Sequence, residues 1–527
     1  MSEMPTRRTV LGAGVALAGT AGLASQAVAS QAHAAPLRAP SPARAADQYV
    51  TPDGPEVVDT ETRRGAGPLR KVSLTATTSR FELGGGLTVP TWAYGDRLPG
   101  EAIRVTAGDT LELALANHLP QATSMHWHGL SLRNDMDGVP GVTQQPVKPG
   151  ADFTYRFAVT HPGTYWIHPH SGVQLDRGLY APLIVDDPKE PLQYDSEWIV
   201  VLDDWLDGVD GSTPDAVLDE LTKGRGGSHD AAGHDMAAAT DGDGDAPSRL
   251  LAGAESDLLG GHAGDVDYPH YLVNGRRAEA PSVFKAHPGD RIRLRVINAG
   301  GDTAFRLALG GHRMTVTHTD GFPVRHTETD ALLLGMGERY DVLVTAGDGV
   351  FPLTALAEGK GASTMAVLRT ARGAVPPPSA RPGELDGQVL TANKLAPDES
   401  VALPAREPDR TVRITLTGSM AAYDWAFDGK RYDPAVRQPV RAGERVRLVF
   451  TNRTSMWHPL HLHGHTFALA GAGKGAAPGA RKDTAAILPR RSLTVDFDAD
   501  NPGLWMLHCH NVYHSESGMM TVLGYLR

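Results

Sequence analysis

The chain has 527 residues, 41% of them hydrophobic and 21% charged, and a formal net charge of −11. Its length suits about three domains of 100–200 residues, and its acidic balance argues against nucleic acid or an anionic membrane as a partner. The single cysteine, Cys509, excludes an internal disulfide. Beyond the N-terminal segment no apolar run is long enough to span a membrane, so we expect no stable membrane insertion.

The N-terminus has the pattern of an export signal. Arg7-Arg8 precedes an apolar run of small residues, and Ala32-His33-Ala34 offers a small-x-small cleavage site. We therefore predict a twin-arginine signal peptide over residues 1–34 and a secreted or cell-envelope location. Residues 35–66 are rich in Ala, Pro and Arg without periodicity, which predicts a mobile lead-in.

A pattern of turn, strand and asparagine recurs three times along the chain. Each copy has a Gly-plus-acid turn, a strand of alternating character and a final asparagine, at 107–117, 288–298 and 442–452. A long regular spacing predicts three copies of one domain. Short strands separated by turns are typical of β-sandwiches and small barrels. We expect an all-β protein with few, short helices.

The domain boundaries follow from this repeat and from composition. We place the three domains at 67–190, 191–375 and 408–527, with a Pro-rich linker at 376–407. An acidic, Gly/Ala-rich insertion lies near 223–264, in or beside the second domain. It carries His229, His234 and Met236, with His262 near its end, and these soft ligands could capture copper ions. The alternative is a solvated loop.

Histidine pairs carry the strongest chemical signal. Histidine makes up about 4% of the chain, so random placement predicts roughly one His-x-His pair, and the chain has five. In a β-strand, residues two apart share one face, so each pair presents two imidazoles together. Four pairs stand in four separate short segments: His126/His128, His168/His170, His461/His463 and His508/His510.

The last pair flanks the only cysteine. In a strand, Cys509 faces away from His508 and His510. A thiolate, two imidazoles and a weak axial thioether describe a blue-copper electron-transfer site. The candidates for that site are Cys509, His514, Met519 and His458. A zinc site from the same residues is the rival, but zinc gives no reason to place four His-x-His pairs around one thiol.

The eight paired histidines suffice for three further copper ions, since neutral imidazole is a good copper ligand. Two pairs belong to the first predicted domain and two to the third. We therefore expect a metal cluster between those domains, which the loss of either domain would abolish.

These segments resemble the four signature motifs of multicopper oxidases, in order, over residues from about 68 to 527. The motifs are Met125–Gly129, Gly163–His170, His458–His465 and the segment around Cys509. Two further segments, 132–138 and 316–321, are similar to twin-arginine-exported actinobacterial members linked to copper defence. The resemblance implies three cupredoxin-like domains (Greek-key β-sandwiches or barrels), the middle one without coppers of its own.

The resemblance also implies four copper ions: one type 1, one type 2 and two type 3. It assigns the type 1 copper to His458, Cys509, His514 and Met519, and the type 2 copper to His126 and His461. It assigns the type 3 pair to His128, His168, His170, His463, His508 and His510.

The implied reaction is an oxidation coupled to O2 reduction. Substrate gives single electrons to the type 1 copper, the electrons pass from Cys509 to His508 or His510, and four of them reduce O2 to water. Asp137 matches a carboxylate near the cluster in related enzymes, so we predict it as a proton donor; the alternative is that it shapes the turn before Gly138. Tyr513 stands where some metal-oxidising relatives carry an acid, and Glu516 lies nearby in sequence.

The predicted function is the oxidation of Cu(I), phenols or both, in copper tolerance. One alternative is a laccase acting mainly on phenols, and another is a non-catalytic exported protein that binds copper or transfers electrons. Electron transfer alone needs only the Cys509 site, so the eight paired histidines favour an enzyme. A copper nitrite reductase would leave most of these pairs unexplained. Because one chain supplies every ligand, we expect a monomer.

Overall fold

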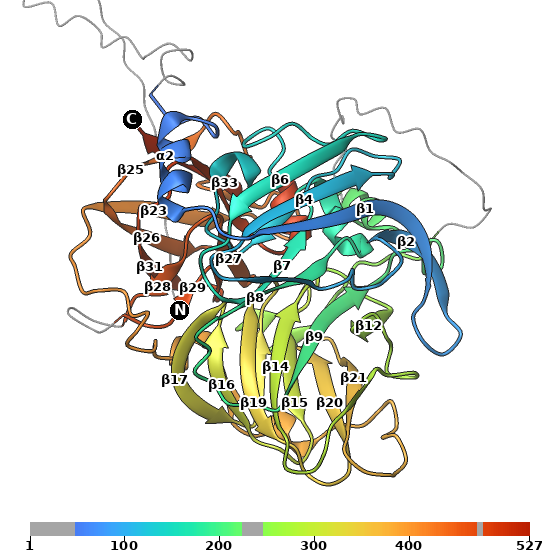
Figure 1. Ribbon diagram of the computed structural model, residues 1–527. Coiled ribbons are helices and arrows are strands. Elements are labelled where there is room, and N and C mark those ends of the chain that lie inside the picture. The colour runs from blue at the N-terminus through green and yellow to red at the C-terminus, as the bar shows by residue number, and fades with distance from the viewer. Residues whose placement is uncertain (1–47, 224–245, 472–477) are drawn as a thin grey trace, which may run out of the picture. The chain divides into compact units, whose positions relative to one another are not determined.

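The structure is a computed structural model that describes residues 48–223, 246–471 and 478–527. The predicted signal peptide at 1–34 lies outside the described residues, as do His229, His234 and Met236 of the insertion. Strands dominate the described part of the chain and its helices are few and short, so the all-β prediction is confirmed (Figure 1). None of the described helices is long and apolar enough to cross a membrane.

Part of the expected mobile lead-in is ordered instead. Helix α2 spans Pro55–Arg64, with proline in its first turn, where the missing N–H costs no hydrogen bond. Val57 and Thr60 are buried, and Arg64 donates to Asn501 Oδ1 at 2.9 Å. The prediction of mobility is therefore wrong for this stretch. Its apolar face is too narrow to stand out from the Ala, Pro and Arg around it.

Two four-stranded sheets form the first part of the fold. One has the order β2-β1-β4-β6 and the other β3-β8-β7-β5. The strands of the first sheet are β1 (Leu69–Glu82), β2 (Thr88–Tyr94), β4 (Thr110–Asn117) and β6 (Asp152–Ala158). Those of the second are β3 (Ile103–Thr106), β5 (His126–His128), β7 (Gly163–His168) and β8 (Ala181–Asp186). Leu111, Leu113 and Leu115 alternate along β4 and are all buried, as expected for a strand with one face on the core.

Two six-stranded sheets form the middle part, with orders β12-β9-β14-β19-β16-β17 and β13-β21-β20-β15-β18-β22. The first contains β9 (Ser196–Trp205), β12 (His270–Val273), β14 (Arg291–Asn298), β16 (Met314–Thr319), β17 (Phe322–Thr329) and β19 (Arg339–Thr345). The second contains β13 (Val283–Lys285), β15 (Phe305–Leu309), β18 (Ala331–Leu334), β20 (Val350–Ala357), β21 (Ala362–Arg369) and β22 (Val389–Leu390). Arg293 and Arg295 are buried within β14, and both contact the Asp341 carboxylate of β19, so the charges are paired.

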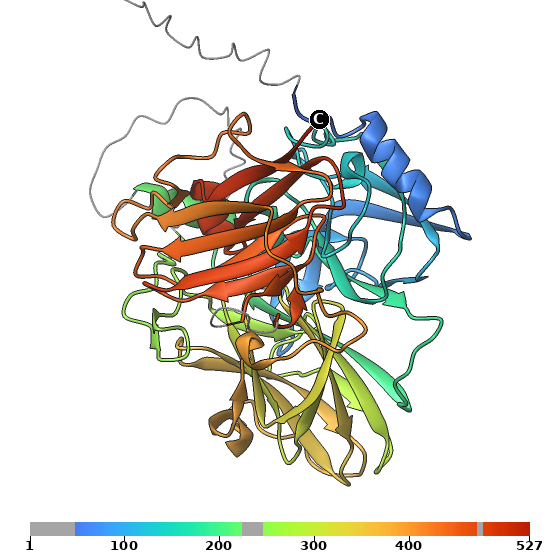
Figure 2. The ribbon, with the colours of Figure 1, turned by 90° about the vertical axis from the view of Figure 1, so that its left-hand side faces the viewer.

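A six-stranded and a five-stranded sheet form the last part, drawn in orange and red in Figure 2. The larger, β24-β23-β26-β31-β28-β29, contains β23 (Arg410–Thr417), β24 (Ala426–Phe427), β26 (Arg445–Asn452), β28 (Phe467–Leu469), β29 (Arg481–Lys482) and β31 (Ser492–Asp498). The smaller, β25-β33-β32-β27-β30, contains β25 (Arg437–Arg441), β27 (His458–Leu462), β30 (Thr484–Ile487), β32 (Leu504–Cys509) and β33 (Met520–Leu526).

Short elements connect these sheets. The helices are α3 (Pro214–Lys223) and α4 (Val512–Ser517), and the 3-10 turns are η1 (Asn134–Met136), η2 (Gly172–Arg177), η3 (Gly383–Asp386) and η4 (Ala392–Lys394). A small hairpin pairs β10 (Glu255–Ser256) with β11 (Gly261–His262).

The predicted threefold repeat is confirmed by topology and by its asparagines. The strands β4, β14 and β26 each pair in parallel with one neighbour and antiparallel with the other. Each strand ends in a buried asparagine, Asn117, Asn298 or Asn452. In every copy the side-chain Nδ2 donates to two main-chain carbonyl oxygens, and Oδ1 accepts from the N–H two residues on. An asparagine thus makes the same set of hydrogen bonds at the end of the equivalent strand in all three copies.

Candidate metal centre

Two pairs of strands carry most of the predicted ligands. In the first, β5 pairs with β7 so that His126 is opposite His168. In the second, β27 pairs with β32 so that His461 is opposite His508. The first pair belongs to the N-terminal sheets and the second to the C-terminal sheets, as the sequence predicted.

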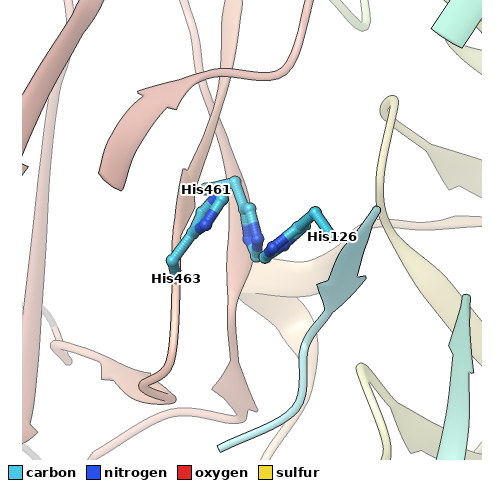
Figure 3. Close-up of side chains that lie close together, drawn as sticks. All are labelled: His126, His461 and His463. Atoms are coloured by element: carbon cyan, nitrogen blue, oxygen red, sulfur yellow. The ribbon is translucent and has the colours of Figure 1, made fainter. Parts of the chain in front are cut away.

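The eight paired histidines converge on one place. The His126 and His463 rings stack at a centroid distance of 3.7 Å, and so do those of His128 and His461. Figure 3 shows the rings of His126, His461 and His463 turned toward one another. Several groups of three ligand atoms lie within 4.8 Å of one another in this cluster. They include His128, His168 and His510; His170, His463 and His508; His126, His461 and His463; and His126, His168 and His170.

Hydrogen bonds on the far side of the rings fix which nitrogen faces this space. The Nδ1 atoms of His126, His461 and His508 lie 2.8–3.0 Å from main-chain carbonyl oxygens, which can only accept. Their Nε2 atoms are buried without a hydrogen-bond partner, as are those of His168, His170 and His463. Such orphaned nitrogens in one enclosed space fit metal ligation, with the outer partner fixing each tautomer.

Burial keeps these imidazoles neutral, the form that binds a metal. Desolvation, and then the neighbouring imidazoles, hold the pKa values of the rings well below the ordinary value for histidine. The rings concerned are His128, His168, His170, His463, His508 and His510.

A second group of ligand atoms surrounds the thiol. Cys509 Sγ lies 3.7 Å from Nδ1 of His458 and 3.7 Å from Nδ1 of His514, and all three residues are buried. The two Nδ1 atoms are 3.0 Å apart. Met519 is also buried, and its carbonyl oxygen accepts the N–H of Cys509 at 3.0 Å. Thiolate and imidazole at this spacing fit a blue-copper site.

The surroundings of this group orient its two imidazoles. His514 lies in the first turn of helix α4. The Asn511 side chain caps this helix by accepting a hydrogen bond from the His514 N–H. On the far side of the rings, His514 Nε2 lies 2.8 Å from Asp265 Oδ2, and His458 Nε2 lies 2.9 Å from Thr454 Oγ1. Both rings therefore present Nδ1 to the sulfur.

Asp137 contacts two histidines of the cluster that come from distant parts of the chain. Its Oδ2 lies 3.0 Å from Nδ1 of His463 and its Oδ1 lies 3.2 Å from Nδ1 of His126. The carboxylate is completely buried. The following Gly138 has φ +83, and a Cβ there would collide with the carbonyl of Met125. Asp137 thus contacts two predicted ligands and also precedes a tight turn.

Tyr513 and Glu516 differ in their surroundings. The Tyr513 hydroxyl donates a hydrogen bond to Asp176 Oδ2 at 2.6 Å, and this bond fixes its position. Glu516 lines a small cavity of about 20 Å³ together with His168, His508 and Ser515. Burial raises the pKa of Glu516 to about 7.

Three polar residues at these sites were missed by the sequence prediction. Asp265 contacts His514, and Asp483 lies 3.1 Å from Nε2 of His128 and is bridged to Arg339. Single acidic or basic residues carry no spacing signal of the kind that reveals a His-x-His pair. Only the fold brings them beside the imidazoles.

A larger cavity, of about 300 Å³, lies beside the thiolate group. Asp265, which contacts His514, forms part of its wall. His262 and Met420 also line it, and His262 Nδ1 is buried without a partner. Leu250 contributes an apolar wall. The cavity thus reaches the hydrogen-bond partner of a predicted type 1 ligand.

Comparison with known proteins gives a consistent result. Three family models described as multicopper oxidase match residues 75–190, 252–373 and 405–525. The chain is 47% identical over 521 residues to "Multicopper oxidase MmcO" of Mycobacterium tuberculosis, covering 99% of this chain and 97% of that protein. It is 28% identical over 536 residues to "Copper resistance protein A" of Escherichia coli, covering 80% and 87%.

A similar solved structure is the laccase from Botrytis aclada, with 25% sequence identity and a TM-score of 0.69, covering 89% of this chain and 90% of that one. Fet3p, a multicopper oxidase that functions in iron import, has a TM-score of 0.70 at 22% identity, covering 87% and 90%. At this sequence identity, the similarity to Fet3p supports the fold alone.

Proposed function

Because the chain belongs to the multicopper oxidase family, we propose that it oxidises Cu(I), phenols or both, one electron at a time, in copper tolerance. It is a copper-dependent oxidase that uses one type 1, one type 2 and two type 3 coppers. When bound, these ions take single electrons from substrate and deliver four to O2. The observation that carries the proposal is the convergence of eight imidazoles, all buried except the half-buried His170, beside a separate thiolate group.

The proposed ligand assignment is the one that the family resemblance implies, and two of the groups of nitrogen atoms support it. His458, Cys509, His514 and the buried Met519 would hold the type 1 copper. The two groups His128, His168, His510 and His170, His463, His508 would hold the type 3 coppers, which leaves His126 and His461 for the type 2 copper. This assignment uses each of the eight imidazoles once.

Strand β32 would join the two sites covalently. Cys509 belongs to the thiolate group, while His508 and His510 on either side of it belong to the histidine cluster. Successive residues of a strand face opposite ways, so a few covalent bonds separate the sulfur from two proposed type 3 ligands. Electrons would take this route.

Asp137 is the proposed proton donor at the cluster. Support comes from its buried carboxylate, which lies within 3.2 Å of nitrogens on both His126 and His463. An Asp137→Asn variant should retain the blue absorption band and lose most O2 reduction. If O2 reduction is unchanged in that variant, Asp137 only stabilises the turn before Gly138 and positions the two rings.

Reducing substrate would enter the cavity of about 300 Å³ beside His514. Asp265 would link the cavity to His514 through their 2.8 Å contact. The imidazole of His262 and the thioether of Met420 are soft ligands that suit Cu(I). A role in copper tolerance is supported by the relatives named as copper resistance proteins.

A laccase acting mainly on phenols is the second candidate. Leu221 and Leu250 give the same cavity apolar walls, and its volume accommodates an aromatic ring. The two candidates predict different substrate preferences of one enzyme.

The test is O2 uptake by the copper-loaded protein, comparing kcat/KM for Cu(I) with that for 2,6-dimethoxyphenol. A strong preference for Cu(I) would support the cuprous oxidase, and a strong preference for the phenol would support the laccase. No uptake with either substrate, from protein that shows the blue thiolate–copper band, would overturn the trinuclear assignment.

Location and assembly complete the proposal. The Arg7-Arg8 segment supports export by the twin-arginine route to the cell envelope or beyond. One chain supplies all the proposed ligands, which supports a monomer. Sedimentation of the copper-loaded protein would test the latter.

A further inference from the structure

The middle sheets reach the histidine cluster, although none of the eight paired histidines belongs to them. We propose that Arg339 of the middle sheets and Asp483 of the last sheets are positioning residues for the trinuclear copper site. Together they fix which nitrogen of His128 and His461 faces the metal. This inference rests on the ligand assignment proposed above.

Asp483 touches two proposed ligands that come from different parts of the fold. It lies between β29 and β30, and its Oδ1 accepts from Nε2 of His128 at 3.1 Å. Its main-chain carbonyl oxygen accepts from Nδ1 of His461 at 3.0 Å. The two rings stack between these contacts, with 9° between their planes. One residue therefore holds both members of a stacked pair.

These contacts give the two rings opposite tautomers. A carbonyl oxygen can only accept, so His461 carries its proton on Nδ1 and presents a free Nε2. His128 donates from Nε2, which leaves Nδ1 free, and this atom lies 3.2 Å from Nε2 of His510. Outer partners of ligating histidines commonly fix tautomer and ring orientation in this way.

Arg339 fixes the carboxylate that makes this possible. Its Nη1 donates to Asp483 Oδ1 at 2.7 Å and its Nη2 to Oδ2 at 2.6 Å, a fork that prevents the carboxylate from turning. Its Nε donates to the carbonyl oxygen of Thr164 on β7 at 3.1 Å. A single buried side chain thus connects all three pairs of sheets at the cluster.

Two glycines show that the arrangement is closely built. A Cβ on Gly129 would collide with Arg339 Nη2 and would lie 2.6 Å from Asp483 Oδ2. A Cβ on Gly337 would lie 2.9 Å from ring atoms of both His128 and His510. Backbone therefore packs directly against the ion pair and the rings, leaving no space at these points for the groups to move.

The neighbouring charges determine how the pair should be changed. Lys482 lies 3.1 Å from Asp320 and 3.1 Å from Glu338, and all three are buried beside Arg339. Removing the cation at 339 would leave an uncompensated buried charge and risk misfolding. Arg339→Lys keeps the charge but loses the fork and the Nε bond to Thr164, while Asp483→Asn keeps the shape of the side chain.

The matched control is Arg293→Lys. Arg293 is also buried in the middle sheets and holds Asp341 through Nε at 3.0 Å and Nη2 at 2.6 Å, without contacting a proposed ligand. This variant shows how much copper binding changes when a buried arginine fork is lost in the same part of the fold but away from the proposed ligands.

The experiment measures copper per protein, the type 2 electron paramagnetic resonance signal and the rate of copper release to a chelator. In Asp483→Asn we expect the trinuclear coppers to be held about 10–100-fold more weakly, with the blue band retained. Arg339→Lys should show a smaller loss of the same kind, and Arg293→Lys should match the wild type.

Retention of all four coppers with unchanged release in Asp483→Asn would overturn the inference. An equal loss of the blue band and of the trinuclear coppers would also overturn it, because it would indicate a general folding defect. If the wild-type protein itself lacks a type 2 signal, the ligand assignment fails instead, so the two failures are distinguishable.

A double variant tests whether Arg339 acts through Asp483. If it does, adding Arg339→Lys to Asp483→Asn should weaken copper binding no further. Additive losses would show that Arg339 acts on the site independently and would overturn that part of the inference.

Discussion

Asn452 offers a test that links the threefold repeat to the thiolate site. Its Nδ2 donates to the carbonyl oxygens of Met456 at 2.7 Å and Leu488 at 3.1 Å. Its Oδ1 accepts from the N–H and the hydroxyl of Thr454 at 2.9 and 2.8 Å. The same hydroxyl oxygen lies 2.9 Å from Nε2 of His458, so Asn452→Ala should also release a proposed type 1 ligand.

The magnitude follows from the bonds that are lost. Four buried hydrogen bonds at about 1 kcal/mol each give a loss of about 4 kcal/mol. Asn117 makes three such bonds at the equivalent corner, so Asn117→Ala should cost about 3 kcal/mol without touching the thiolate site. Either loss should lower Tm by about 10 °C.

Thermal unfolding and the intensity of the blue band are the two measurements. Both variants should lose thermal stability, and only Asn452→Ala should lose or shift the blue band. The reasoning would be refuted if Asn117→Ala changed the blue band as much, or if Asn452→Ala left both the band and Tm unchanged.

Three further predictions concern substrate, pH and metal. Asp265→Asn should lower kcat/KM about 10-fold while the blue band persists, because the substrate cavity loses its charged link to His514; an unchanged kcat/KM would remove Asp265 from the substrate path. Burial would raise the pKa of Asp341, but Arg293 and Arg295 hold it at about 2. Because this folded pKa lies below the unfolded value, the ionised carboxylate contributes about 2 kcal/mol of stability, which is lost as pH falls from about 4 to about 2. In acid titrations followed by circular dichroism, Asp341→Asn should therefore show a smaller loss of stability over this pH range. Removing copper with a chelator should lower the calorimetric Tm, by about 4 kcal/mol of stability if copper is present at about 1,000 times its Kd, and an equal Tm with and without copper would contradict metal binding to the folded state alone.

The proposed ligand residues could be recognised in the sequence because their signal is local. A His-x-His pair shows its chemistry within three residues of a strand, and Asn117, Asn298 and Asn452 mark the repeat through the same short pattern. The fold was then confirmed in its class and its threefold plan, while the domain boundaries stay a prediction.

The residues that orient the ligands could not be predicted, because their partners are far away in the chain. Arg339 and Asp483 are separated by 144 residues, and Asp265 and His514 by 249. Helix α2 was missed for a different reason, since a composition of Ala, Pro and Arg hides a short helix that is stabilised by contacts with distant residues such as Asn501.

The contact between His128 and His510 also sets an order of events during synthesis. His128 and His510 face each other across 382 residues, so the earliest and latest motifs must both exist before the cluster can form. N-terminal sheets generally fold first on the ribosome, and they would present His126 and His128 with only half of their partners. Since metal affinity depends on a complete folded site, the trinuclear coppers should be acquired only after translation ends, and a prematurely terminated chain should leave the ribosome without them.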